Sequence, residues 1–162
     1  MTDNEFNRIS EQYIDIVYRS AINICKNKSD AEDAVQNTFL KLLKSDIDFE
    51  NEDHIRRWLI RVAVNECKNI WKSPWNKKIS SFEELEKEPV YIENEKSELF
   101  AEVMSLPQKY RIVLHLYYYE DYSVREISRI LGISETNVQT RLMRARKKLR
   151  VQLKEAWNDE QI

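Results

Sequence analysis

The sequence predicts an all-α protein of two small helical domains joined by a flexible linker. A single glycine and three prolines in 162 residues leave few turn signals for a β-rich fold. Hydrophobic residues make up 42% of the chain, which is enough for the cores of two small domains. Their spacing is helical on both sides of a polar stretch that contains Pro74 and Pro89. We therefore expect domains over residues 1–72 and 99–157, with the linker over residues 73–98.

Two amphipathic helices are predicted at the start of the chain, over residues 6–24 and 30–44. Ser29, followed by Glu32 three residues later, is typical of a capping box and would open the second helix. One face of that helix is apolar. The other face is either ordinary solvent-exposed surface or a docking site, and it carries Glu32, Asp33, Gln36, Asn37 and Lys41.

A third helix is predicted over residues 53–72, after an acidic loop over residues 45–52. Phe49 in the loop should pack back onto the domain, and Trp58 in the helix should belong to the core. One face of the helix has no acidic residue and carries Arg57, Arg61, Asn65, Lys68 and Lys72. Such a face can hold single-stranded nucleic acid, because its cations attract the phosphates of the nucleic-acid backbone. Similar stripes of lysine and arginine are nevertheless common on the helices of soluble proteins.

The linker holds seven glutamates and is long for a compact protein, so we expect it to be flexible or shaped by a partner. Two supporting helices should follow it. The first begins near Leu99 and the second includes Tyr110 to Tyr117, with Pro107 between them.

Residues 122–150 have the pattern of a helix-turn-helix. Ser123 and Glu126 form a capping-box pair that opens a short apolar-faced helix. Gly132, the only glycine in the chain, follows where a tight turn needs a residue tolerant of positive φ. Ser134 can then cap a second helix.

The second helix of this motif should have two contrasting faces. An apolar stripe, Val138, Leu142, Ala145 and Leu149, must face the first helix. The opposite face carries side chains able to contact base edges and phosphates in a major groove, namely Thr136, Asn137, Thr140, Arg141 and Arg144. Residues 141–150 hold six cations and no anion, although the whole chain has a formal charge of −2. The plainer alternative is a solvated basic face on an ordinary helix pair.

No catalytic or metal site is predicted. Cys25 and Cys67 lack the CxxC spacing, and His54 and His115 belong to no cluster with metal-ligand spacing. The chain has no phosphate-binding glycine loop, no GxSxG and no triad candidate. It also has no signal peptide and no apolar run long enough to span a bilayer. We expect a cytoplasmic protein with reduced thiols, no cofactor and no enzymatic activity.

Three segments resemble those of the extracytoplasmic-function (ECF) group of bacterial RNA polymerase sigma factors. The core-polymerase-binding helix of that group resembles DAEDAVQNTFLKLLK, residues 30–44. Its promoter-melting helix resembles HIRRWLIRVAVNECKNIWK, residues 54–72, and its region-four pattern resembles residues 106–150. The resemblance covers nearly the whole chain in matching order. It implies a sigma factor that directs promoter recognition, DNA melting and transcription initiation at stress- or signal-specific genes.

The resemblance also implies roles for three groups of residues. Core RNA polymerase would contact Asp30, Glu32, Asp33, Gln36, Asn37 and Lys41. Single-stranded promoter DNA at the minus-ten element would contact Ile47, Phe49, Asn51, Arg57, Arg61, Asn65 and Lys68. The duplex minus-thirty-five element would contact Glu135, Thr136, Asn137, Thr140, Arg141, Arg144, Lys147 and Lys148. The acidic loop over residues 46–52 departs from many relatives, which leaves open the side chains that capture a flipped base.

The resemblance further implies a linker directed toward the polymerase active-site cleft and an anti-sigma partner, soluble or membrane-anchored. Two other classes stay open. A stand-alone helix-turn-helix regulator would bind its operator as a dimer without polymerase. A protein-only module such as a sigma antagonist is disfavoured by the six-cation run. A pull-down with core RNA polymerase followed by run-off transcription separates these classes.

Overall fold

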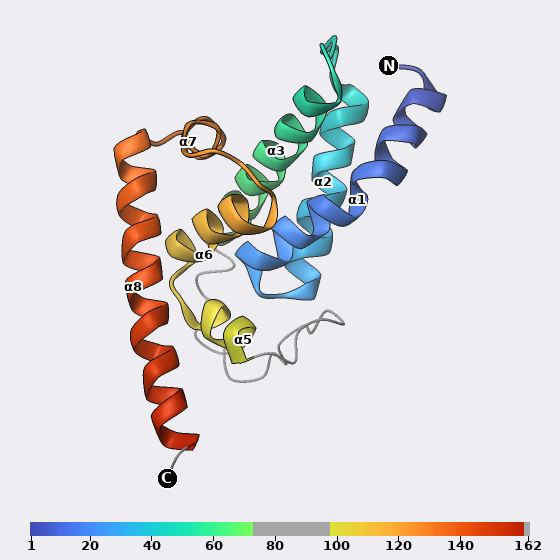
Figure 1. The fold of residues 1–162 in the computed structure, drawn as a ribbon. Coiled ribbons are helices and arrows are strands. Elements are labelled where there is room, and N and C mark those ends of the chain that lie inside the picture. The colour runs from blue at the N-terminus through green and yellow to red at the C-terminus, as the bar shows by residue number, and fades with distance from the viewer. Residues whose placement is uncertain (73–97, 161–162) are drawn as a thin grey trace. The chain divides into compact units, whose positions relative to one another are not determined.

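The computed structural model describes residues 1–72 and 98–160, and every regular element in these ranges is a helix (Figure 1). The chain divides into two compact units, Met1–Val90 and Tyr91–Ile162. The predicted all-α fold with two helical domains is therefore confirmed. The predicted linker lies almost entirely outside the described residues, so its limits stay a prediction.

In its described part, the first unit contains three helices, α1 (Asp3–Cys25), α2 (Lys28–Lys44) and α3 (Glu52–Lys72), each packed against the other two (Figure 1). All three contribute side chains that are fully enclosed, among them Ile9, Val17, Leu42, Leu59 and Ile60. Cys25 and Cys67 are buried and are not joined by a disulfide. The apolar faces predicted from helical spacing thus meet in one core.

The predicted capping box at Ser29 is wrong. The cap of α2 is Asn27, whose side-chain oxygen accepts a hydrogen bond from the backbone N–H of Asp30 at 3.2 Å. Lys26 adopts a left-handed conformation with φ 55°, which ends α1 and reverses the chain. The turn is so short that Asn27 already lies in cap position, and asparagine caps a helix as well as serine does. Ser29 therefore lies within the helix.

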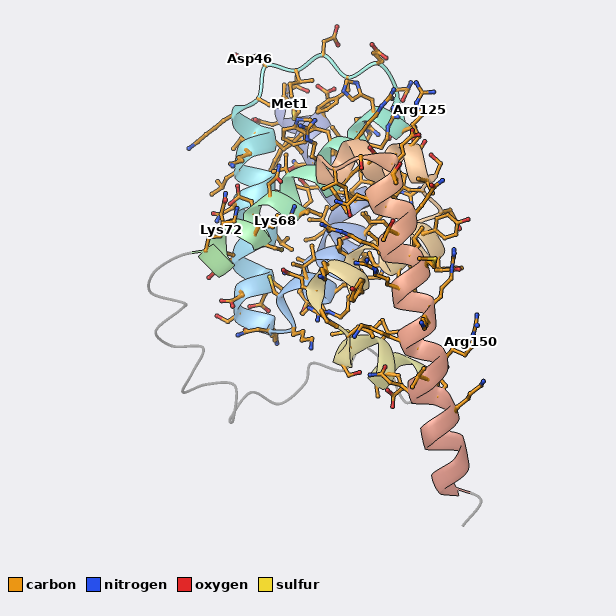
Figure 2. All side chains as sticks on the ribbon, turned by 90° about the vertical axis from the view of Figure 1, so that its left-hand side faces the viewer. Met1, Asp46, Lys68, Lys72, Arg125 and Arg150 are labelled. Carbon is orange, nitrogen blue, oxygen red and sulfur yellow. The ribbon has the colours of Figure 1, made fainter. Side chains whose placement is uncertain are left out.

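The loop between α2 and α3 is anchored by its aromatic residue, as predicted. The Phe49 ring packs edge-on against His54, with ring centroids 5.2 Å apart, and against Trp58 at 5.7 Å. Asn51 caps α3, since its side-chain oxygen accepts from the backbone N–H of His54 at 2.8 Å. Asp46 lies near the start of this loop, shortly after the end of α2 (Figure 2).

The second unit contains α5 (Glu98–Ser105), α6 (Gln108–Leu114), the π-helical turn η1 (His115–Tyr119), α7 (Val124–Leu131) and the long helix α8 (Glu135–Glu160). Helices α5, α6 and α7 all pack against α8 (Figure 1). The buried guanidinium of Arg111 donates to the carbonyl of Leu106 at 2.6 Å and fastens the corner between α5 and α6. Next to α7, buried His115 lies 3.3 Å from the carboxylate of Glu120.

The predicted helix-turn-helix is confirmed in its local chemistry. The Ser123 hydroxyl accepts from the N–H of Glu126 at 3.2 Å, and the Glu126 carboxylate accepts from the N–H of Ser123 at 3.1 Å. Gly132 has φ 67°, which a side chain would strain. The Ser134 hydroxyl accepts from the N–H of Asn137 at 3.0 Å and caps α8.

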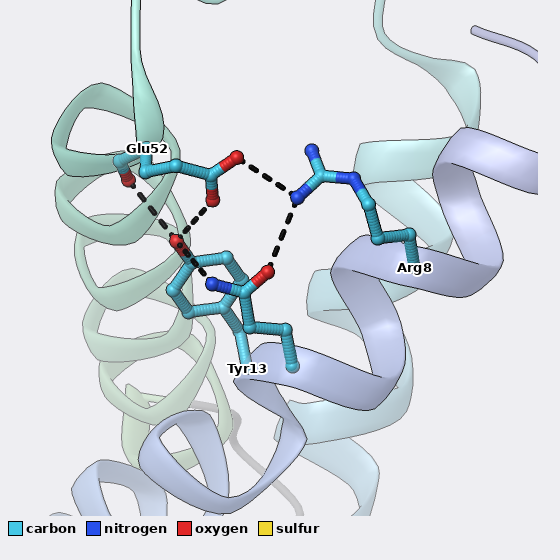
Figure 3. Close-up of polar contacts among 4 residues, drawn as sticks. Arg8, Tyr13 and Glu52 are labelled. Atoms are coloured by element: carbon cyan, nitrogen blue, oxygen red, sulfur yellow. Dashed lines mark hydrogen bonds and ion pairs between the residues drawn. The ribbon is translucent and has the colours of Figure 1, made fainter.

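A polar network joins α1 to the start of α3 (Figure 3). The Tyr13 hydroxyl donates to the Glu52 carboxylate at 2.6 Å, and the Arg8 guanidinium donates to the same carboxylate at 2.8 Å. Burial, followed by the bond to Glu52, raises the pKa of Tyr13 to about 12. The hydrogen bond from Tyr13 lowers the pKa of Glu52, and Arg8 adds to that effect. Glu52 also opens α3, where the helix dipole favours a negative charge.

The two pKa shifts predict opposite pH windows for stability. Tyr13 has a raised folded-state pKa, so its contribution is complete below its ordinary value of 10.0 and is lost as pH rises toward about 12. Glu52 has a lowered pKa, so its contribution is present above its ordinary value of 4.5 and is lost in more acidic solution.

We expect Tyr13→Phe to lower the free energy of unfolding by about 1 kcal/mol at neutral pH, because it removes one hydrogen bond to a charged but exposed group. Urea denaturation followed by circular dichroism should show the difference from wild type shrinking below pH ~4.5 and above pH ~10. Tyr119→Phe removes an exposed hydroxyl and should have no effect. A difference that is constant from pH 4 to pH 11 would contradict the linkage.

Candidate nucleic-acid and polymerase interfaces

The recognition helix α8 has the two faces that the sequence predicts. Val138, Leu142 and Ala145 are buried, and α8 packs on α7. Thr136, Asn137 and Arg144 are exposed, as are Glu135 and Lys147, whereas Thr140 and Arg141 are partly buried. Thr136, Thr140, Arg144 and Lys147 follow one another at intervals of four, four and three residues and so share the outer face. We call this set the outer face of α8.

Two of the predicted base-contacting residues are already paired with each other. The Arg141 Nε donates to the side-chain oxygen of Asn137 at 3.0 Å. This bond holds both side chains along the edge of α8. It leaves the amide N–H groups of Asn137 and the remaining N–H groups of Arg141 available as donors.

The six cations after Thr140 do not form one uniform surface. The Arg146 Nε donates to the Tyr118 hydroxyl at 2.6 Å, and its guanidinium lies 5.5 Å from the ring centroids of both Tyr117 and Tyr118. The Lys148 ammonium lies 5.8 Å from the Tyr110 ring. Arg144, Lys147 and Arg150 are exposed and have no side-chain partner within the described part of the chain. Arg150 projects from α8 into solvent in Figure 2.

Three exposed residues of the second unit were missed by the sequence reasoning. Arg125, labelled in Figure 2, and Arg129 lie one turn apart on α7, opposite its buried face. Neither has an anionic partner among the described residues. Met143 is 60% exposed on α8. The two arginines stand outside the basic run, and Met143 was passed over because only the polar members of its face were considered. Helical spacing relative to the apolar stripe would have placed all three on the surface.

In α3, Arg61 and Asn65 are exposed one turn apart on the predicted cationic stripe. Arg57 is partly buried and lies 3.4 Å from the carboxylate of Asp53, one turn earlier. Lys68 is partly buried near the C-terminal end of the helix, beside exposed Lys72 (Figure 2). Arg61, Asn65 and Lys72 are thus the exposed members of the stripe.

The three residues of the predicted base pocket in the α2–α3 loop differ in exposure and in their contacts. Phe49 is partly buried against His54 and Trp58, and the side-chain oxygen of Asn51 is occupied as the cap of α3. Ile47 is exposed, and the neighbouring acids Asp46, Asp48 and Glu50 are exposed as well. Of the three predicted pocket residues, Ile47 is therefore the one whose apolar side chain reaches solvent.

The polar face of α2 is exposed at Glu32, Asp33, Gln36 and Asn37, whereas Asp30 is partly buried. Lys41 has a structural role, because its ammonium forms an ion pair with buried Glu66 of α3. Leu40 and Leu43, which the sequence reasoning passed over, are 44% and 47% exposed on the same helix. Apolar and polar side chains thus lie together on the exposed surface of α2.

We expect Lys41→Ala to lower the free energy of unfolding by about 1–2 kcal/mol, because it leaves the buried Glu66 carboxylate without this cation. Lys28→Ala is the matched control, since the Lys28–Glu32 pair is exposed on both sides and should contribute less than about 0.5 kcal/mol. Chemical denaturation measures both values. Equal effects would show that Glu66 gains nothing from Lys41.

Two models of known protein families match the chain. The model of sigma-70 region 2 matches residues 9–76, and the model of sigma-70 region 4 matches residues 97–149. The ECF RNA polymerase sigma factor SigM of Bacillus subtilis is 32% identical over 161 residues, which cover 94% of this chain and 97% of SigM. The chain belongs to the ECF family of sigma factors. The RNA polymerase sigma factor SigV of Bacillus subtilis is 31% identical, with 84% of this chain and 83% of SigV covered.

Solved structures with low sequence identity support the fold. The sigma factor RpoE, from its complex with the anti-sigma factor NepR of Bartonella quintana, matches with a TM-score of 0.75 and 19% identity over 93% of this chain and 97% of RpoE. CnrH, in complex with the cytosolic domain of CnrY, matches with a TM-score of 0.66 and 20% identity over 95% of this chain and 90% of CnrH. The region 2 match thus covers α1 from residue 9 together with α2 and α3, and the region 4 match covers α5 to α7 and α8 as far as residue 149.

Proteins of this family are transcription factors rather than enzymes. Within the described ranges, no three His, Cys, Asp or Glu side chains come together as a metal site. None of the helices in those ranges is long and apolar enough to cross a bilayer.

Proposed function

We propose that this sigma factor divides its work among three helices. Helix α2 docks on core RNA polymerase, α3 holds the separated promoter strand, and α8 reads the upstream duplex element. The observation that carries the proposal is the outer face of α8. Helix α8 follows the capped helix α7 and the turn at Gly132, and no acidic residue occurs from Thr136 to Lys154. A surface of hydroxyls and cations is complementary to the phosphates and base edges of a major groove.

The roles of the α8 residues should differ with their position. The N-terminal half of a recognition helix contacts base edges, so Asn137 and Thr140 are placed to discriminate sequence. Arg144 and Lys147, further along the outer face, are placed to neutralise phosphates. The engagement of Arg146 with two tyrosine rings makes it a residue that holds α8 against the unit rather than a DNA contact.

We expect Arg144→Ala and Lys147→Ala to weaken binding of the holoenzyme to promoter DNA, each lowering the slope of log affinity against log salt by about one. Asn137→Ala should instead reduce discrimination between promoters. Lys109→Ala, which removes a cation from α6, is the matched control. Run-off transcription with core RNA polymerase supplies the activity readout. Binding to the same duplex with equal affinity in the absence of polymerase would favour a stand-alone regulator.

Promoter opening is assigned to α3 because Arg61 and Asn65 are exposed on its cationic stripe. A separated strand can run along such a face with its phosphates neutralised. Unstacking a base costs a few kcal/mol, so contacts that form only with the opened strand should affect melting more than initial docking. Ile47 is the candidate apolar contact for an extruded base.

We expect Arg61→Ala and Asn65→Ala to keep core binding and closed-complex formation but to lose permanganate-reactive thymines near the start site. Both variants should recover activity on a template with a pre-melted bubble. Lys44→Ala, which removes an exposed cation from α2, should open the promoter normally. Variants that stay inactive on the bubble template would place the defect in a step other than melting.

The polymerase contact is assigned to the exposed residues of α2, where Leu40 and Leu43 add apolar area to the polar group around Asp33 and Gln36. An anti-sigma factor is a further partner. RpoE was solved bound to the anti-sigma factor NepR, and CnrH was solved bound to the cytosolic domain of CnrY. The proposed site of action is the cytoplasm, where core polymerase and promoter DNA are found.

A further inference from the structure

Met143 is an apolar side chain on the surface that is assigned to DNA. It is 60% exposed, more than any other apolar side chain described on α8. Single exposed apolar residues are normal on protein surfaces and by themselves need no explanation. Met143 differs from such residues in its neighbours, which the helical spacing of α8 places around it.

The neighbours of Met143 on the helix surface carry no negative charge. Gln139 and Thr140 lie one turn before it, and Arg146 and Lys147 lie one turn after it. Arg146 is held by the tyrosine rings of η1, so the residues beside Met143 that face outward offer a hydroxyl, an amide and the Lys147 ammonium. This surface is electrostatically suited to a polyanion.

The major groove presents one apolar group. Guanine, adenine and cytosine offer only hydrogen-bond donors and acceptors on their major-groove edges, whereas thymine adds its 5-methyl group. Burying the thioether of methionine against purely polar edges would desolvate those edges without replacing their hydrogen bonds. The side chain has three rotatable bonds, which let it follow a methyl group without strain in the helix.

We infer that Met143 is a specificity residue that contacts the 5-methyl group of a thymine in the upstream promoter element. This inference rests on the proposed role of α8 in reading duplex DNA. Met143 lies three residues after Thr140 and directly before Arg144, so its contact falls between the predicted base-reading and phosphate-binding parts of the helix. Val151, also apolar and 50% exposed, lies two turns further on and is too far along the helix to share that base.

The test uses uracil, which differs from thymine only by the missing methyl group. Wild-type holoenzyme first selects duplexes from a pool randomised over the upstream element. Each thymine of the selected element is then replaced singly by uracil, and affinity is measured for wild type, Met143→Ala and Val151→Ala. Circular dichroism checks that the variants are folded.

At one thymine, uracil should lower the affinity of wild type about fourfold, which corresponds to one buried methyl group. Met143→Ala should bind the thymine duplex with a similar loss and show no further response to uracil at that position. Val151→Ala should keep the full response. The Arg144→Ala variant should bind both duplexes more weakly while keeping their ratio.

Three results of the DNA-binding measurements would overturn the inference: a selected element without thymine, a wild type that ignores every uracil, or a Met143→Ala variant that still responds to the methyl group. A loss of affinity for core polymerase in Met143→Ala would also overturn it and would assign the residue to a protein contact. If Arg144→Ala and Lys147→Ala still weaken binding, only the role of Met143 fails. If they have no effect, the proposed role of α8 fails as well.

Discussion

Burial of Val138, Leu142 and Ala145 against the helices of the second unit is the constraint on which the proposed DNA surface depends. A unit this small has one core, and α8 can contribute only one stripe to it. Once that stripe is buried, the opposite residues must face solvent. The left-handed Gly132 and the Ser134 cap make this packing possible, because they change the direction of the chain within three residues and let α8 begin at once.

In the described part of the first unit, the packing of three long helices likewise leaves residues exposed to solvent. Mutual packing of α1, α2 and α3 leaves each with one outer face, so Gln36 on α2 and Arg61 on α3 are exposed for the same reason. Polar contacts then fix the helix ends. The Tyr13–Glu52 bond ties α1 to the start of α3, and Lys41 joins α2 to the buried carboxylate of Glu66. These contacts hold the outer faces in a constant arrangement within the unit.

Charge alone does not tell a functional cation from a structural one. Arg144 and Arg146 are two residues apart in one basic run, yet Arg144 is exposed without a partner among the described residues and Arg146 is held by Tyr118. Lys41 has an ammonium like that of Lys44, but the ammonium of Lys41 forms an ion pair with the buried carboxylate of Glu66. An uncharged residue, Met143, stands instead in the middle of the polar surface. Specific recognition of DNA needs side chains that differ in shape and polarity, because phosphate contacts position a protein on DNA without reading the base sequence.

The sequence by itself determined the properties that depend on local periodicity. Helical spacing predicted each amphipathic element, and the Ser123, Gly132 and Ser134 signals predicted the helix-turn-helix, because capping and positive φ are set by a few neighbouring residues. Only the tertiary structure decided which side chains meet across helices. It paired Lys41 with Glu66 and Tyr13 with Glu52, because these contacts depend on how packing brings residues far apart in the chain within a few ångströms of each other.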